Sequence, residues 1–328
     1  MSQLRRRLLR AAAIAGTVAA IAATLYMSRS TFAQVAGLGH PRPGWLLLAL
    51  VAEVLALAAY AQLVRVLLRA AGVAAGLGGL LRATVGGIAM NASLPAGQGV
   101  STVYWYKELR RQGAEPAVAG VALSASTLAG VGSMGGLMVA GVALAGDTGP
   151  LASARVWIVG GGVLLIAARF VFQRQLMRGF NWVLQHLAHT AASIDANWRT
   201  VGAVTGSAYA NWLLDCACLW LCLVAVHAHV SVRSLLLVYV LAQLVAAIPL
   251  LPGGGGTVEV SLTLGFAAFG YDDAAVVTGA ILYRLVSCWG LIPIGWFLVA
   301  TGHQHHHSIR WRWRELRDSH KRRVLTAD

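Results

Sequence analysis

Six stretches of the chain are apolar over a length that approaches or exceeds the roughly 20 residues that a helix needs to cross a bilayer. Polar or basic segments separate them. The first stretch follows a basic segment and precedes no convincing cleavage site, so it is interpreted as a retained helix rather than a signal peptide. The six predicted membrane helices are Ala11–Met27, Gly44–Leu63, Ala117–Ala145, Val156–Phe172, Val201–Ala228 and Ala274–Ala300.

Two further apolar runs end at proline and glycine. Leu80–Ser93 leads into a break at residues 94–99, and Leu235–Leu251 leads into a break at residues 251–256. Proline and stacked glycines end a helix and leave backbone groups that lipid cannot satisfy, so protein or water must surround such a break. A second short apolar stretch follows each break. Both regions are therefore predicted to be helix–break–helix elements.

The two breaks repeat one pattern. At a constant offset of 157 residues and without gaps, Leu94-Pro95 falls on Leu251-Pro252. A gapless match of this kind indicates an internal duplication. Further pairs at the same offset include Gly97 with Gly254, Gly99 with Gly256, Gly113 with Gly270, Glu115 with Asp272, and Ala117 with Ala274.

Loop charges orient the two copies. Basic loops favour the cytoplasmic side of a membrane, which places the N-terminus and both ends of residues 80–111 inside. The second break region returns at Tyr271-Asp272-Asp273, which has no Lys or Arg, so both of its ends are placed outside. Three full crossings separate the two regions. Because that number is odd, the repeats are predicted to have inverted topology, an architecture typical of membrane transporters.

Composition supports the same class of protein. Hydrophobic residues make up 58% of the 328 residues and charged residues only 12%, which argues against a soluble enzyme, a disordered chain or a disulfide scaffold. The net charge of +14 comes from basic runs between apolar segments and at both ends. That distribution favours contact with anionic lipid over nucleic acid. The cysteines are interpreted as buried hydrophobic residues: Cys216, Cys218, Cys222 and Cys288.

The predicted fold is an all-α polytopic membrane protein with about six full crossings and two re-entrant broken helices. One transmembrane domain is expected over residues 1–302, with repeat 1 at about 44–146 and repeat 2 at about 201–302. A basic cytoplasmic tail follows at 303–328. The protein is expected in the cell membrane with both termini in the cytoplasm.

Three motifs resemble a known family. They are Asn91-x-x-Leu94-Pro95-x-Gly97-x-Gly99, Pro252-Gly253-Gly254-x-Gly256-x-x-Glu259 and Tyr283-Arg284-Leu285. With them, nearly the whole chain resembles the flippase-like transmembrane domain of lysylphosphatidylglycerol synthases and its stand-alone relatives. The resemblance implies movement of lipids or lipid-linked molecules between leaflets.

Two departures from the family matter. Relatives often carry a basic residue shortly after the first motif, where this chain has Ser101-Thr102-Val103, so any head-group role of such a residue passes to Lys107 or lapses. The synthases add a large soluble domain, whereas only 28 residues follow Ala300. Synthase activity is therefore not expected.

Three ionisable residues in apolar stretches are candidates for a substrate site, because such groups are costly in a membrane and usually serve a function. Arg284 suits a lipid phosphate, and the alternative is a structural ion pair with Glu259. Glu259 follows the second break, where it either caps the returning half-helix or acts in proton coupling or gating. Asp215 either balances Arg284, takes up a proton or belongs to a buried salt bridge.

The breaks themselves supply further candidates. Backbone N–H groups at the start of each half-helix can hold an anion, although glycine there also allows close helix packing. Asn91, Gln98, Ser101 and Thr102 would add neutral polar contacts. The complete set of predicted substrate-binding residues is Arg284, Glu259, Asp215, Asn91, Pro95, Gly97, Gly99, Ser101, Thr102, Lys107, Pro252, Gly253, Gly254, Gly256 and Tyr283.

No cofactor and no metal are expected, since the sequence has no nucleotide-binding loop and the histidines at 303–307 are interpreted as an interfacial stretch. The leading hypothesis is a carrier for an anionic phospholipid or a polyprenyl-phosphate-linked glycolipid. One alternative is a non-transporting scaffold or regulator of a lipid-modifying or cell-envelope glycosyltransferase enzyme. Another is a carrier of small polar solutes. Expected partners are the lipid substrate, the membrane, and either a lipid-modifying enzyme or further copies of this chain.

Overall fold

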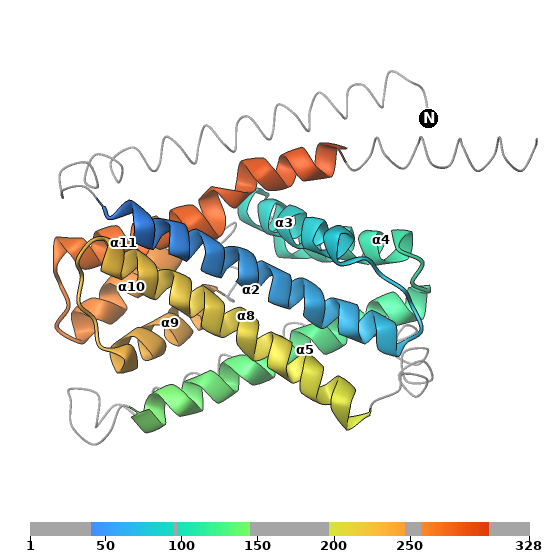
Figure 1. The fold of residues 1–328 in the computed structure, drawn as a ribbon, viewed down its shortest axis with the longest axis horizontal. Coiled ribbons are helices and arrows are strands. Elements are labelled where there is room, and N and C mark those ends of the chain that lie inside the picture. The colour runs from blue at the N-terminus through green and yellow to red at the C-terminus, as the bar shows by residue number, and fades with distance from the viewer. Residues whose placement is uncertain (1–40, 95–96, 145–196, 247–256, 302–328) are drawn as a thin grey trace, which may run out of the picture.

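A computed structural model describes residues 41–94, 97–144, 197–246 and 257–301, and the regular structure in these ranges is helical throughout (Figure 1). The final helix starts as α11, passes through a π-helical turn and continues to Thr301. The elements are α2 (Pro43–Ala70), α3 (Leu77–Ser93), α4 (Gly97–Arg111), α5 (Pro116–Leu144), α8 (Trp198–Ala225), α9 (Val232–Ala246), α10 (Thr257–Ala268), α11 (Ala274–Arg284) and the π-helical turn η2 (Leu285–Trp289).

Four of the described helices are long and apolar enough to cross a membrane: α2, α5, α8 and the final helix Ala274–Thr301. The candidate span in each of them is 28 residues long, which in α5 is Pro116–Ala143. This is about 42 Å at the rise of an α-helix, which exceeds a hydrocarbon core of about 30 Å. The prediction of membrane helices at these four places is confirmed, although α2 continues past Leu63 to Ala70. The predicted helices at 11–27 and 156–172 and the tail at 303–328 lie outside the described residues.

Two glycines of the duplicated pattern make the same turn. Gly113 lies between α4 and α5 with φ of 95°, and Gly270 lies between α10 and α11 with φ of 81°. Positive φ is a conformation that glycine adopts at little cost. The two positions are 157 residues apart and each precedes a membrane-length helix. Residues that match at this offset in the sequence therefore also share a backbone conformation at these turns.

The first break region folds as a helical hairpin. A Cβ atom added to Gly79 would contact Gln112, one at Gly86 would contact Tyr104, and one at Gly97 would contact the backbone of Asn91. The start of α3 therefore lies beside the end of α4, and the end of α3 lies beside the start of α4. The two helices are antiparallel. The glycines let the helices approach closely.

The second break region folds in the same way. Gly265 of α10 faces Val238 of α9, and at the open end of this hairpin the backbone N–H of Ser231 donates to the hydroxyl of Tyr271 over 3.2 Å. The helix–break–helix prediction is consistent with both hairpins. That each one enters and leaves a membrane on the same side stays a prediction.

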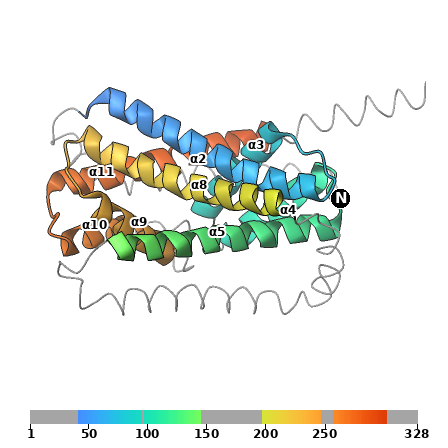
Figure 2. The same cartoon turned by 60° about the horizontal axis from the view of Figure 1, so that its bottom comes forward.

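Helices α2 and α8 lie side by side along much of their length (Figures 1 and 2). The backbone N–H of Arg42 donates to the carbonyl of Ala225 over 3.0 Å, and Nδ2 of Asn211 donates to the carbonyl of Ala56 over 3.0 Å. These two pairs require an antiparallel arrangement. Because α2 opens the first half of the described fold and α8 opens the second, their contact joins the two halves.

The core consists of two main clusters. One contains Leu63, Leu80 and Leu109 from the first half. The other contains Tyr239 and Phe266 from the second half. Each cluster also takes in residues from the other half, so the halves pack into each other rather than forming separate domains.

Candidate functional site

An ion pair joins α10 to the end of α11. Nε of Arg284 lies 2.9 Å from Oε1 of Glu259, and the two side chains are only 9% and 16% exposed. Arg284 also takes part in further interactions. The structure therefore brings together two of the residues that the sequence singles out, and the arrangement matches the structural alternative stated for Arg284.

Local structure explains the meeting of these two side chains. Glu259 lies in the first turn of α10, where a carboxylate is favoured by the helix dipole. Val258, Leu262 and Phe266 recur every four residues and are buried, which fixes the rotation of α10. The turn at Gly270 then reverses the chain, so α11 runs back along α10.

A π-helical turn begins directly after Arg284. The backbone N–H of Gly290 donates to the carbonyl of Leu285 over 2.7 Å, five residues back. Single π turns inside α-helices are frequent at functional sites. This turn was not predicted from the sequence, because the apolar pattern of the stretch contains no signal for it.

Asp215 lies at the centre of a hydrogen-bond network. Its Oδ2 atom accepts from the hydroxyl of Tyr239 at 2.6 Å, from Nε2 of Gln243 at 2.9 Å and from the hydroxyl of Tyr283 at 3.0 Å. Gln243 also donates to the Tyr283 hydroxyl over 3.2 Å. Since Tyr283 precedes Arg284 in the chain, the network and the ion pair adjoin. We call the two together the polar cluster.

Glu53 also belongs to the polar cluster, although it is not among the site residues predicted from the sequence. It lies on α2, is 4% exposed, and its carboxyl group contacts that of Asp215 across the interface between α2 and α8. The signal that could have found it was a single acid within the apolar run 44–63. That is the same signal that drew attention to Asp215.

The candidate residues of the first break mostly contact their own hairpin. Gly97 packs against the backbone of Asn91, and the hydroxyl of Ser101 lies beside Gly87. The hydroxyl of Thr102 donates to the carbonyl of Gln98 over 2.8 Å. Two others, Gly99 and Lys107, lie on the same helix: Gly99 has open space where a side chain would extend, and Lys107 is exposed.

One contact ties the first break to the final helix. Nε1 of Trp296 donates to the hydroxyl of Ser93 over 3.0 Å. Trp296 lies 12 residues after Arg284, about 18 Å along an α-helix. The remaining candidates lie outside the described residues: Pro95, Pro252, Gly253, Gly254 and Gly256.

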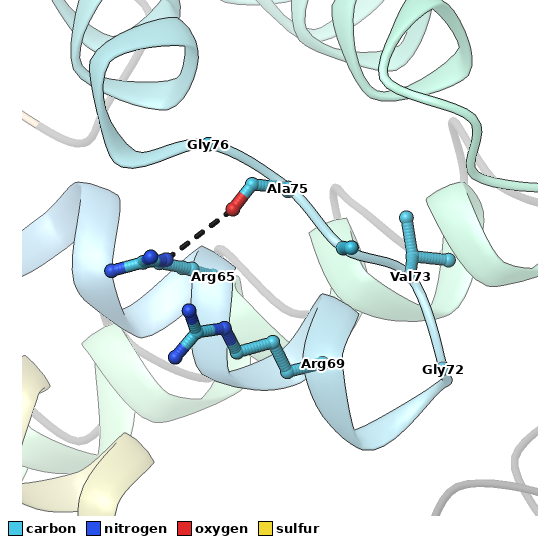
Figure 3. Close-up of a pocket in the computed structure, with 7 residues that line it drawn as sticks. Arg65, Arg69, Gly72, Val73, Ala75 and Gly76 are labelled. Atoms are coloured by element: carbon cyan, nitrogen blue, oxygen red, sulfur yellow. Dashed lines mark hydrogen bonds between the residues drawn. The ribbon is translucent and has the colours of Figure 1, made fainter.

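A second polar feature lies at the end of α2. Arg65, Arg69 and the loop from Gly72 to Gly76 line a hollow of about 420 Å³ (Figure 3). Nε of Arg65 donates to the carbonyl of Ala75 over 3.3 Å, and both arginines line the hollow from α2 (Figure 3). Two cations beside a loop suit an anionic group, such as a phosphate at a membrane surface.

Across the part of the chain that the structure covers, no group of three or more His, Cys, Asp or Glu side chains is arranged to hold a metal ion. The long apolar helices, the two hairpins and the buried polar cluster define a polytopic helical membrane protein. The chain belongs to the family described as the lysylphosphatidylglycerol synthase TM region, whose profile matches residues 8–295. The resemblance stated from the motifs is thereby confirmed.

Individual relatives match shorter segments. A UPF0104 membrane protein of Methanothermobacter thermautotrophicus is 29% identical over 100 residues, which are 30% of this chain and 30% of that protein. A phosphatidylglycerol lysyltransferase of Bacillus subtilis is 32% identical over 98 residues, 30% of this chain and 11% of the relative. One of Staphylococcus aureus is 34% identical over 91 residues, 27% of this chain and 11% of the relative. The matched segments thus span a third or less of these curated relatives.

Proposed function

We propose that this protein moves an anionic amphiphile between the leaflets of the cell membrane, either a phospholipid or a polyprenyl-phosphate-linked glycolipid. The observation that carries the proposal is the buried pair of Arg284 and Glu259 in the transmembrane region of a lipid-related family. A guanidinium group binds a phosphate through two parallel hydrogen bonds. The head group would contact Arg284 while the acyl or prenyl tails stay in lipid.

The ion pair is suited to exchange. A buried Arg needs an acidic partner, and Glu259 supplies one when no substrate is bound. A lipid phosphate brings the same charge and can replace the carboxylate at Arg284. Glu259 is 16% exposed and lies at the start of α10, where the helix dipole continues to stabilise its charge after the pair opens.

An inverted repeat would give this site access from both leaflets. In support, the two halves have the same order of elements, one long helix, one hairpin and a second long helix. The turns at Gly113 and Gly270 correspond, and α2 and α8 are antiparallel. In the proposed topology the hairpins enter from opposite faces and both chain termini lie in the cytoplasm.

Transport rather than catalysis is the proposed role of this chain. The relatives named phosphatidylglycerol lysyltransferase match over 11% of their length, and their activity is a property of those proteins. Their names do favour one alternative, in which this domain serves a lipid-modifying enzyme as a scaffold or regulator. That alternative predicts a stable enzyme partner and no lipid movement by the isolated protein.

Reconstitution tests the proposal. The purified chain is placed in liposomes that carry a fluorescent phosphatidylglycerol, and movement is followed by chemical quenching of the outer leaflet. We expect Arg284→Gln to reduce the rate to that of protein-free liposomes. Arg284→Lys should restore it only in part, because an ammonium group lacks the bidentate geometry. Arg199→Gln, at an exposed position of α8, serves as the matched control. A normal rate with folded Arg284→Gln protein would remove Arg284 from the site.

A further inference from the structure

Two acids from opposite halves of the fold meet inside the protein. Glu53 of α2 and Asp215 of α8 bring their carboxyl groups into contact, one helical turn from the hydrogen bond between Asn211 and Ala56. Glu53 is 4% exposed. Two ionised carboxylates cannot share such a site without strong repulsion, so the contact itself needs an explanation.

The hydrogen bonds to the two carboxyl groups are unevenly distributed. Three donors converge on Oδ2 of Asp215, namely Tyr239, Gln243 and Tyr283, and donors of this kind stabilise the charged form of a carboxylate. In contrast, Oδ1 of Asp215 and Oε2 of Glu53 are buried and accept no hydrogen bond from the described residues. A proton on Glu53 that is donated to Asp215 satisfies the pair and removes one negative charge.

Among the described residues, the charges around the pair do not compensate both acids. Arg284 lies near Glu53 and Asp215, but its Nε is bonded to Glu259. Among described residues, three acids therefore surround one guanidinium group. The other titratable side chains that the described residues bring into the vicinity are phenols and thiols: Tyr239, Tyr283, Cys216, Cys218, Cys222 and Cys288.

We propose that Glu53 and Asp215 form a binding site for one proton, carried by Glu53 and shared with Asp215, and that this proton is bound together with the anionic head group at Arg284. The inference rests on the proposed function and adds its coupling ion. The proton is taken from water on one side of the membrane. It is returned to water on the other side, after the phosphate has left, so both carboxyl groups are regenerated.

Thermodynamic linkage gives the direction of coupling. A phosphate beside Arg284 adds negative charge near the acid pair and so favours the bound proton. By reciprocity the bound proton favours the phosphate to the same extent. The lipid therefore binds more tightly at lower pH, and a pH gradient drives the head group together with the proton away from the more acidic side.

The first experiment detects the proton without any lipid. Infrared difference spectra of the full-length protein at neutral pH should contain the C=O stretch of a protonated carboxyl group. That band should disappear in Glu53→Gln and persist in Glu108→Gln, a matched control at the α4 acid paired with Arg111. If Glu53→Gln does not fold, Asp215→Asn should shift the band, because the Glu53 proton loses the carboxylate that accepts it, and an unshifted band would overturn the proposal. A wild-type spectrum without the band overturns the proposal.

The second experiment measures the coupling. Binding of a short-chain phosphatidylglycerol to the detergent-solubilised protein should weaken as pH rises, by up to tenfold per pH unit when one proton is linked. In Glu53→Gln the affinity should no longer depend on pH, whereas Glu108→Gln should retain the wild-type dependence. An infrared band at Glu53 combined with pH-independent binding in the wild type would overturn the coupling.

The failures of the two proposals are distinguishable. In liposomes with an imposed pH gradient, the wild type should accumulate phosphatidylglycerol in one leaflet, and Glu53→Gln should only equilibrate it. Lipid movement that ignores the gradient overturns the proton proposal and leaves the lipid carrier in place. Absence of any lipid movement or binding removes the carrier and the coupling together, and the infrared band then decides whether the proton site exists.

Discussion

The two halves of the described fold share a backbone plan but differ in chemistry. Both contain a long helix, a hairpin, a glycine turn with positive φ and a second long helix. The positions that precede Asp215, Glu259 and Arg284 by 157 residues are Ala58, Thr102 and Thr127. Thr102 and Thr127 donate to carbonyls of their own helices over 2.8 and 2.9 Å.

The comparison separates backbone features, which both halves share, from charges, which they do not. The glycine turns and the close helix contacts recur in both halves because the backbone requires them, whereas the charges of the polar cluster lie mainly in the second half. The first half contributes Glu53, for which the second half has Ala210 at the same offset. The polar cluster is therefore asymmetric although the framework is not.

The largest expected effect concerns the orientation of the two halves. Single cysteines at Arg111→Cys and Asp272→Cys, in a background without native cysteines, should react with a membrane-impermeant reagent from opposite faces. The reason is that the two turns belong to hairpins that enter from opposite sides in the proposed topology.

Each labelling should be all-or-none in sealed vesicles of known orientation. Permeabilised vesicles, in which both cysteines react, serve as the control. Reaction of both from one face would end the inverted-repeat interpretation and with it the functional comparison of the halves.

A second test compares the ion pair of Glu259 and Arg284 with Thr102 and Thr127, the neutral residues at the matching positions of the first half. Glu259→Gln should lower the free energy of unfolding by about 3–5 kcal/mol, because it removes the carboxylate partner of a buried guanidinium group. Thr102→Val and Thr127→Val should each cost under about 1 kcal/mol, since these hydroxyls bond only to nearby backbone.

Equilibrium unfolding in mixed micelles checks this difference. The double variant Glu259→Gln/Arg284→Gln should be more stable than the sum of the single losses indicates. Additive losses would mean that the two side chains do not interact.

A third test addresses the shared turns. Gly113→Ala and Gly270→Ala should each destabilise the protein by about 1–2 kcal/mol, because alanine disfavours positive φ. No atom lies within 4 Å of an added Cβ at either position, so the effect reports the backbone alone. Gly130→Ala, within α5 and also in open space, should be neutral or stabilising. Unequal losses at the two turns in unfolding experiments would show that the halves have diverged in backbone as well as in charge.

The smallest expected effect concerns the hollow at the end of α2. Arg65→Gln and Arg69→Gln should each weaken binding of phosphatidylglycerol vesicles by about 1 kcal/mol or less, roughly fivefold, since each basic residue near an anionic surface contributes about that much. Added salt should reduce the difference. Equal binding to neutral phosphatidylcholine vesicles by both variants and the wild type is the control, and a loss on those vesicles too would point to misfolding.

The sequence predicts the framework better than the polar contacts. Helix length and hydropathy locate α5, α8 and the final helix to within a few residues, because an apolar run of fixed length has few alternatives. It also places Glu259 in the first turn of its helix and the turn at residues 270–273.

The partners in the cluster could not be predicted in this way. The contact of Glu53 with Asp215 depends on how α2 and α8 cross, and helices that are apolar on all faces leave that rotation unspecified. The hydrogen bonds that Tyr239 and Gln243 donate to Asp215 likewise depend on how the helices are rotated against each other. Neither residue stands out by type, since tyrosine and glutamine are tolerated in many environments.

The π-helical turn after Arg284 has a consequence for the alignment of the final helix. Helix α5, at the same place in the first half, is regular over Pro116–Leu144, so the wide turn is a difference in helical phase between the two halves. A π turn contains one residue more than the α turn it replaces, and one residue corresponds to about 100° of rotation. Everything beyond the turn is thereby rotated relative to the segment before it. Gly295 packs against Val85 in this phase, and Trp296 reaches Ser93. Deleting one residue within the turn would keep Arg284 in place but rotate that far segment away from the first hairpin.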